Sequence, residues 1–378
     1  MFIHFETLRM VNLSARTMHE FVENFQKLVK CEEVRTDNNI FKLHYKFTVI
    51  LFIVFSILLS SKQYFGDPIH CDVASQKQLV DVFCWATGTF IVMDHVNDKY
   101  YRTVGVEGLG NQGHKETYTL LYYQWICLLF CFQALLFYVP RYLWKAWEGD
   151  RLSQMVKDLC GPLISEKWSS TYKEKMTNFI TTNDNHDVFA YRFAFCEFLN
   201  LCNLIIQCLF MDWYLNGKFS LYGYEVATKP WPQAYNRVFP KKTKCVYTKF
   251  GHSGSVVDID ALCVLPLNIL NEKFFLIIWY WMIVMFVVTF GALIYRMLVL
   301  TWREFRIYLL MAQVRSVSRK KCRELGKHLT HGQFFLLYNI GKNMNPIIYK
   351  ELVLSIYEHL LIRKSITDDA DNDVRLDL

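Results

Sequence analysis

Apolar residues in this sequence gather into four long stretches, separated by polar and charged segments. The stretch from Thr117 to Pro140 carries no charged side chain. As a helix it would extend roughly 36 Å, enough to cross a hydrocarbon core of about 30 Å. Because a backbone in lipid must satisfy its own hydrogen bonds, a helix is the expected conformation. Similar stretches cover Phe47–Ser61, with a continuation to Phe65, Phe193–Met211 and Phe274–Tyr295. The pattern predicts an all-α polytopic membrane protein with four transmembrane helices.

The four predicted spans divide the chain into successive segments and place both termini on one side of the membrane. These are an N-terminal region (1–46), a first span (47–65), a first outer loop (66–116), a second span (117–140), a middle loop (141–192), a third span (193–213), a second outer loop (214–273), a fourth span (274–295) and a helical C-terminal region (296–378). The last residues are acidic, which predicts a disordered tail.

The distribution of lysine and arginine predicts the orientation, because basic loops remain on the cytoplasmic side. Residues 1–46, 141–192 and 296–378 hold 29 Lys and Arg residues, against 13 in residues 62–116 and 212–273. We therefore expect cytoplasmic termini and a cytoplasmic middle loop.

The N-terminal region contains a second kind of pattern. Between Met18 and Val29 apolar residues recur at helical spacing, with charged residues on the opposite face. This predicts an amphipathic helix over residues 18–30. From the residues alone, the same helix is equally compatible with a position on the membrane surface.

Composition and cysteine placement agree with this topology. The chain is 53% hydrophobic and 16% aromatic, which is rich for a water-soluble protein. Four of its 12 cysteines fall in the predicted outer loops, Cys71 and Cys84 in the first and Cys245 and Cys263 in the second. An even number in an extracellular region predicts disulfides, and four cysteines allow three pairings. We expect the other eight to be reduced.

Motifs for other functions are weak. Gly108–Gly113 matches GxGxxG, but the next segment is a predicted span, not the amphipathic helix of a dinucleotide-binding fold. His328 and His331 lack further ligands for zinc, and neither GxSxG nor HExxH occurs in the sequence. We therefore expect no enzyme, no metal site, no cofactor and no nucleic-acid partner.

A polar stripe runs along the third predicted span. It consists of Glu197, Asn200, Asn203 and Gln207. Polar groups within a membrane face either other helices or a water-filled path. Hydrogen bonding between helices is the favoured interpretation, with pore lining as the alternative.

Several motifs, in order along the chain, resemble those of the innexins, the invertebrate gap-junction proteins. They are QYFGDPI at 63–69, Tyr122-Tyr123-Gln124-Trp125 in the second span, Pro140-Arg141-Tyr142-Leu143-Trp144, LCVLPLN at 262–268 and FFLLYNIGKNMNP at 334–346. The resemblance extends from about Met18 to about Leu354. It is closest to insect members of the family.

The resemblance implies a ring of about eight four-helix subunits around a wide pore, docked through its outer loops to a ring on the adjacent cell. It also implies disulfides between the loops, Cys71 with Cys263 and Cys84 with Cys245. The N-terminal helix would enter the pore and the first span would line it, which places five pore-lining residues: His19, Glu20, Glu23, Lys27 and Lys62. Family members of this type tend to begin near the position of Met18, whereas 17 residues precede it here. Either translation starts at Met18, or the preceding segment projects into the pore mouth, where its apolar residues could act as a plug.

Two other functions remain open. An unpaired hemichannel would release solutes to the outside, and an adhesion or scaffold protein would not conduct. A glycan on an outer loop would obstruct docking, but no Asn in residues 62–116 or 212–273 has Ser or Thr two places later. The main hypothesis is a gap-junction subunit in the plasma membrane at cell–cell contacts, in contact with membrane lipid and with related subunits.

Overall fold

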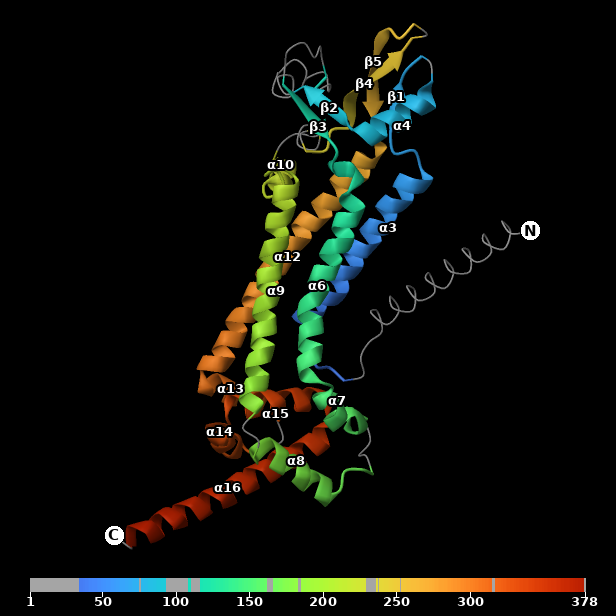
Figure 1. The fold of residues 1–378 in the computed structure, drawn as a ribbon. Coiled ribbons are helices and arrows are strands. Elements are labelled where there is room, and N and C mark those ends of the chain that lie inside the picture. Colours follow the sequence, from blue (N-terminus) through green and yellow to red (C-terminus); the bar gives the residue numbers. More distant parts are fainter. Residues whose placement is uncertain are drawn as a thin grey trace, which may run out of the picture. The chain divides into compact units, whose positions relative to one another are not determined.

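A computed structural model gives the fold (Figure 1) and describes residues 34–74, 76–92, 108–109, 116–161, 166–182, 185–228, 236, 238–251, 253–314 and 317–376. The predicted amphipathic helix at 18–30, with His19, Glu20, Glu23 and Lys27, lies outside these residues. The chain forms two compact units. The sheet-bearing unit comprises Phe47–Val139 and Leu199–Phe290, and the helical unit comprises the described parts of Met1–Lys46, Pro140–Phe198 and Gly291–Leu378.

Within the described residues, four helical segments are long and apolar enough to cross a membrane. The first covers Asn39–Phe65 and joins α2 (Asn39–Lys42), a π-helical turn η1 (Leu43–Thr48) and α3 (Val49–Phe65). The others are α6 (Ile126–Glu148), α9 (His186–Tyr214) and α12 (Pro266–Thr301). The predicted class, a polytopic membrane protein with four transmembrane helices, is confirmed.

The second predicted span, 117–140, is corrected at its start. Its first residues form strand β3 (Thr117–Leu120) and the short helix η3 (Tyr122–Gln124), and α6 continues beyond Pro140 to Glu148. A charge-free stretch does not by itself determine the backbone conformation. Here the alternating Thr and Tyr residues favour a strand, which pairs with β2 (Thr89–Val92).

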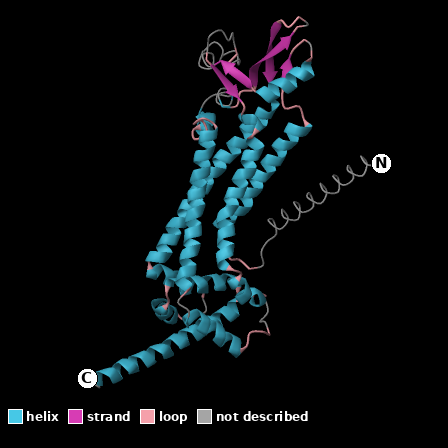
Figure 2. Ribbon diagram, viewed as in Figure 1, coloured by secondary structure: helices cyan, strands magenta, loops and turns pink. Residues whose placement is uncertain are grey.

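The sheet-bearing unit contains a sheet that the sequence did not predict (Figure 2). Its strand order is β1-β5-β4-β2-β3, with antiparallel pairs throughout. The strands not yet introduced are β1 (His70–Asp72), β4 (Lys242–Phe250) and β5 (Val256–Val264). Helices α4 (Lys77–Thr87) and α10 (Tyr222–Thr228) belong to the same unit. The two predicted outer loops therefore form one joint structure, with β1, β2 and β3 from the first loop and β4 and β5 from the second.

Aromatic side chains join the long helices within this unit. Phe55 of α3 stacks on Phe274 of α12 with a centroid distance of 4.2 Å. Phe130 of α6 lies 5.5 Å from Phe52 of α3 and 5.3 Å from Phe275 of α12. Such pairs add to the burial of apolar surface, so α3, α6 and α12 share one aromatic core.

The helical unit packs short helices around an apolar core. Its helices are α7 (Arg151–Val156), the turn η4 (Lys157–Leu159), α8 (Ser170–Thr182), α13 (Arg303–Gln313), α14 (Arg319–His328), α15 (His331–Asn343) and α16 (Pro346–Leu376). The acidic tail that the sequence predicts to be disordered is therefore part of helix α16 as far as Leu376. Core residues such as Leu310, Ile340 and Leu352 are fully buried. Arg306 of α13 caps the C-terminal end of α12. Its guanidinium donates hydrogen bonds to the backbone carbonyl oxygens of Val299 and Leu300, both at 3.0 Å.

Helix α15 is fixed at its first turn. Thr330 and Gln333 form a capping box, in which each side chain bonds the other residue's backbone. Gly332 lies so close to the start of α9 that an added Cβ would be 2.0 Å from the carbonyl carbon of His186. The glycine therefore allows the backbones of α15 and α9 to approach each other.

Candidate functional site

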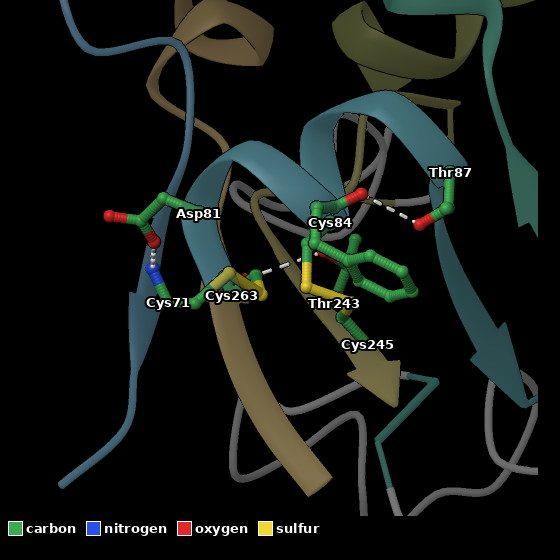
Figure 3. The surroundings of a disulfide bond; sticks show 8 residues. Cys71, Asp81, Cys84, Thr87, Thr243, Cys245 and Cys263 are labelled. Atoms are coloured by element: carbon green, nitrogen blue, oxygen red, sulfur yellow. Dashed lines mark hydrogen bonds between the residues drawn. A yellow bond between two sulfur atoms is a disulfide. The ribbon is translucent and has the colours of Figure 1, made fainter. Parts of the chain in front are cut away.

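Two disulfides brace the sheet. Cys71 of β1 is bonded to Cys263 of β5, and Cys84 of α4 is bonded to Cys245 of β4 (Figure 3). Cys71 and Cys263 are also direct partners in the β1–β5 register. These are the pairs that the family resemblance implies, and each links the first predicted outer loop to the second. All four cysteines are buried.

Hydrogen bonds fix the elements around the disulfides (Figure 3). Asp81 of α4 accepts a hydrogen bond from the backbone N–H of Cys71 at 2.7 Å. Thr243 of β4 lies between the two bridges, and its hydroxyl lies 3.4 Å from the carbonyl oxygen of Cys263. Helix α4 is thereby held to β1 by Asp81 and to β4 by its disulfide.

The sulfur atoms of Cys71, Cys84 and Cys263 lie within 4.8 Å of one another. This spacing resembles that of a metal site. Metal ions bind the thiolate form of cysteine, whereas these sulfurs are all engaged in disulfide bonds. The cluster is therefore a structural brace.

The hairpin between β4 and β5 carries apolar side chains at its tip. Phe250 is 70% exposed and Val256 is 61% exposed, and the two residues are direct partners in the β4–β5 register. The turn is closed by hydrogen bonds between Gly251 and Ser255 (2.8 Å) and between Gly254 and Gly251 (3.0 Å). An exposed apolar pair of this kind is typical of a protein interaction surface.

The Tyr122–Trp125 motif forms hydrogen bonds with several helices of the sheet-bearing unit. Tyr122 accepts a hydrogen bond from Asn268 Nδ2 at 3.2 Å, and its backbone carbonyl accepts one from Tyr214 Oη at 2.7 Å. Gln124 donates to the carbonyl oxygen of Trp85. Desolvation raises the pKa of the Tyr122 phenol, so it remains a neutral donor and acceptor. The motif therefore ties α4, α9 and α12 to the start of α6.

The polar stripe of α9 bonds neighbouring helices, as favoured from the sequence. Asn203 donates to the carbonyl oxygen of Leu136 on α6 at 3.2 Å. Gln207 donates to Asn203 at 3.4 Å. In the helical unit, Glu197 accepts from Arg296 of α12 and from Asn38, the latter at 2.6 Å.

Sequence reasoning missed a second buried ion pair in the helical unit. Arg141 of α6 pairs with Asp37, which also accepts a hydrogen bond from Tyr45 Oη at 3.1 Å. The guanidinium of Arg141 lies over the Tyr45 ring, 4.9 Å from its centroid. The sequence feature that could have indicated this ion pair is Arg141 itself, a single arginine directly after the charge-free stretch. A buried arginine requires an acidic partner.

The remaining predicted site residues occupy separate places. Lys62 lies in the last turn of α3 and is half-buried. Trp125 is exposed and Pro140 is buried within α6. A role for Lys62 in lining a pore stays a prediction.

Comparison with known proteins gives consistent results. The innexin family model matches residues 37–360. The chain is 41% identical to innexin inx2 of Schistocerca americana over 353 residues, which cover 91% of this chain and 98% of that protein. It is 41% identical to innexin inx2 of Drosophila melanogaster over 346 residues, which cover 89% and 94%. It is 33% identical to innexin shaking-B of Drosophila melanogaster over 356 residues, which cover 91% and 95%.

Proposed function

This chain belongs to the innexin family of gap-junction channel subunits, and from that premise we propose how it assembles and docks. About eight copies, alone or with related innexins, form a ring in the plasma membrane. The braced sheet of each subunit faces the extracellular gap and meets a ring on the adjacent cell. The joined rings then pass ions and small molecules between the two cells.

The observation that carries the docking proposal is the apolar hairpin tip on a doubly cross-linked sheet. Association costs less when the contacting surface is already ordered, because fewer side chains and loops lose freedom on binding. The bridges Cys71–Cys263 and Cys84–Cys245 hold the hairpin strands to β1 and α4. Exposed Phe250 and Val256 would supply the apolar centre of the contact.

The proposed orientation follows from two independent arguments. Disulfides persist in an oxidising environment, which favours an extracellular position for the sheet. Lys and Arg are concentrated in residues 1–46, 141–192 and 296–378, which favours a cytoplasmic helical unit with both termini. Both arguments give the same orientation at a cell–cell junction.

The proposed conduction path uses the N-terminal residues. The helix predicted at 18–30 would place His19, Glu20, Glu23 and Lys27 along the pore, with Lys62 further along the path. A wide path with mixed charges would select weakly, since ions keep their hydration. This part of the proposal rests on sequence and on family resemblance.

Paired-cell recording tests the docking proposal. Phe250→Ser combined with Val256→Ser is expected to lower junctional conductance at least about tenfold, because the contact loses its apolar centre. Surface biotinylation and single-cell hemichannel current should stay unchanged. Tyr308→Ser, which alters an exposed aromatic residue of α13, serves as the control and should leave coupling intact.

Two outcomes would contradict this proposal. Unchanged coupling in the double variant would remove the hairpin tip from the contact. Absence of junctional conductance in the wild type, alone or with a related innexin and despite surface expression, would remove the junction itself. Hemichannel current without coupling would then favour the unpaired channel, and contact without any current would favour a scaffold.

A further inference from the structure

The helical unit contains a cavity of about 450 Å³ that the channel function does not use. It lies among α7, α8, α9 and α15, close to where α6 ends at Glu148 and α9 begins at His186. Its volume falls within the range of about 300–1,000 Å³ that is typical of small-molecule sites. The cavity therefore lies beside the ends of two membrane-spanning helices and can hold a small ligand.

The inner wall of the cavity is apolar. Leu152 of α7, Phe189 of α9 and Leu336 of α15 are buried residues that line it, together with Phe179 of α8. Two polar lining groups already have partners within the protein. His186 forms a hydrogen bond with the carbonyl oxygen of Phe179 at 3.0 Å, and Tyr172 donates to that of Met155 at 3.2 Å. This wall suits a hydrocarbon body.

Three exposed residues that line the cavity are polar, and one of them carries a positive charge. Arg151, Gln154 and Asn185 line it and are exposed. Among the described residues, none forms an ion pair or a side-chain hydrogen bond with these three side chains. A guanidinium and two amides at the rim of an apolar wall can bind an anionic head, because arginine matches carboxylate and phosphate oxygens with two parallel hydrogen bonds.

We propose that this cavity binds an anionic acyl amphiphile, with its carboxylate or phosphate head on Arg151 and its chain along Leu152 and Phe189. Other ligand classes fit less well. A nucleotide polyphosphate needs several cations, whereas Arg151 is the only Arg or Lys that lines the cavity in the described part of the chain. A divalent cation needs carboxylates, and the described lining residues include none.

The ligand has two sources, a free fatty acid or a phospholipid of the surrounding membrane. The test uses full-length protein in nanodiscs and two photoreactive probes, a diazirine oleate and a diazirine phosphatidic acid. Peptide mapping should place the label on residues of α7 and α9 that line the cavity. Labelling by oleate alone identifies a free fatty acid, and labelling by phosphatidic acid alone identifies a membrane lipid.

Three variants test the assigned roles. Arg151→Gln should weaken labelling by the anionic probes about tenfold and leave labelling by a neutral diazirine oleyl alcohol unchanged. Gln154→Trp should reduce labelling by all probes, because the indole fills the mouth. Lys175→Gln removes a charge from the exposed side of α8 and should change nothing.

The proposal is overturned if neither anionic probe labels the cavity peptides. It is also overturned if Arg151→Gln labels like the wild type, or loses the neutral and anionic probes equally. Thermal unfolding of each variant in the same nanodiscs serves to check that the helical unit remains folded. A change limited to the anionic probes cannot arise from unfolding.

Discussion

Glu197 of α9 and Arg296 of α12 form a bidentate ion pair inside the helical unit. Arg296 Nε lies 2.5 Å from one carboxylate oxygen, and its terminal nitrogen lies 2.9 Å from the other. The guanidinium also lies over the rings of Phe193 and Phe335, at 4.9 Å and 5.4 Å from their centroids. Both charged side chains are buried, so each requires the other.

We expect Arg296→Met to lower the free energy of unfolding by about 3–5 kcal/mol, because it leaves the Glu197 carboxylate buried without its partner. The double variant Arg296→Met with Glu197→Gln should recover a large part of this loss. Chemical denaturation of the purified protein in detergent measures both values. Equal losses in the single and double variants would show that the two charges are not coupled.

Gly332→Ala should also destabilise the helical unit. Its Cβ would lie 2.0 Å from backbone atoms at the start of α9, which cannot move as a flexible side chain can. We expect a loss of more than about 3 kcal/mol, comparable with a severe overpacking defect. Thermal unfolding provides the measurement.

Gly291→Ala is the matched control, because nothing lies within 4 Å of the added methyl group. In a helix this change should be neutral or stabilise by up to about 1 kcal/mol. If Gly332→Ala and Gly291→Ala had similar melting temperatures, the backbones of α15 and α9 would not be as close at Gly332 as described.

The four long helices could be predicted from the sequence because charge-free stretches of this length have few other conformations. Their ends could not be predicted by the same criterion. Helix α12 begins at Pro266, before the charged Glu272 and Lys273. Glu272 is buried and pairs with Lys241 at 3.0 Å and with its neighbour Lys273 at 3.2 Å, so the charged residues are compatible with the helix start.

Three of the five strands contain only three or four residues, so the order of the sheet could not be predicted. A period of two cannot be recognised over so few positions. Strands β4 and β5, with nine residues each, are long enough for an alternating pattern. The residues alone also left three disulfide pairings open. The strand order selects among them, because β1 pairs with β5 and thereby places Cys71 opposite Cys263.

Removal of either disulfide should abolish docking and leave insertion into the membrane intact. The bridges span 192 and 161 residues of sequence, and loss of a native disulfide typically costs about 2–5 kcal/mol. Cys84→Ser with Cys245→Ser should lose junctional conductance and keep cell-surface protein. Cys131→Ser is the control, since Cys131 is free and exposed. Coupling at the wild-type level in the double variant would reject a role for the bridge in docking.

Lys342 of α15 predicts a pH dependence for the helical unit. Desolvation, followed by repulsion from Arg296, lowers its pKa to about 8, although Glu197 acts in the opposite direction. The unfolded chain has the ordinary lysine pKa of about 10.4, so between these values it binds more protons than the folded protein does. The free energy of unfolding should therefore rise as pH increases from about 8 toward 9.5. The accessible surface of Lys342 places its side chain among the exposed residues, so solvent screens the charge and the rise should be much smaller than the full shift would give.

Lys342→Met isolates this contribution. The variant lacks the titrating ammonium, so the difference between its free energy of unfolding and that of the wild type should change with pH over this range. Denaturation at pH 7.5, 8.5 and 9.5 measures the difference. Lys350→Met removes the same charge from α16 of the helical unit and provides the charge-matched control. A constant difference between wild type and Lys342→Met would show that Lys342 titrates alike in the folded and unfolded states.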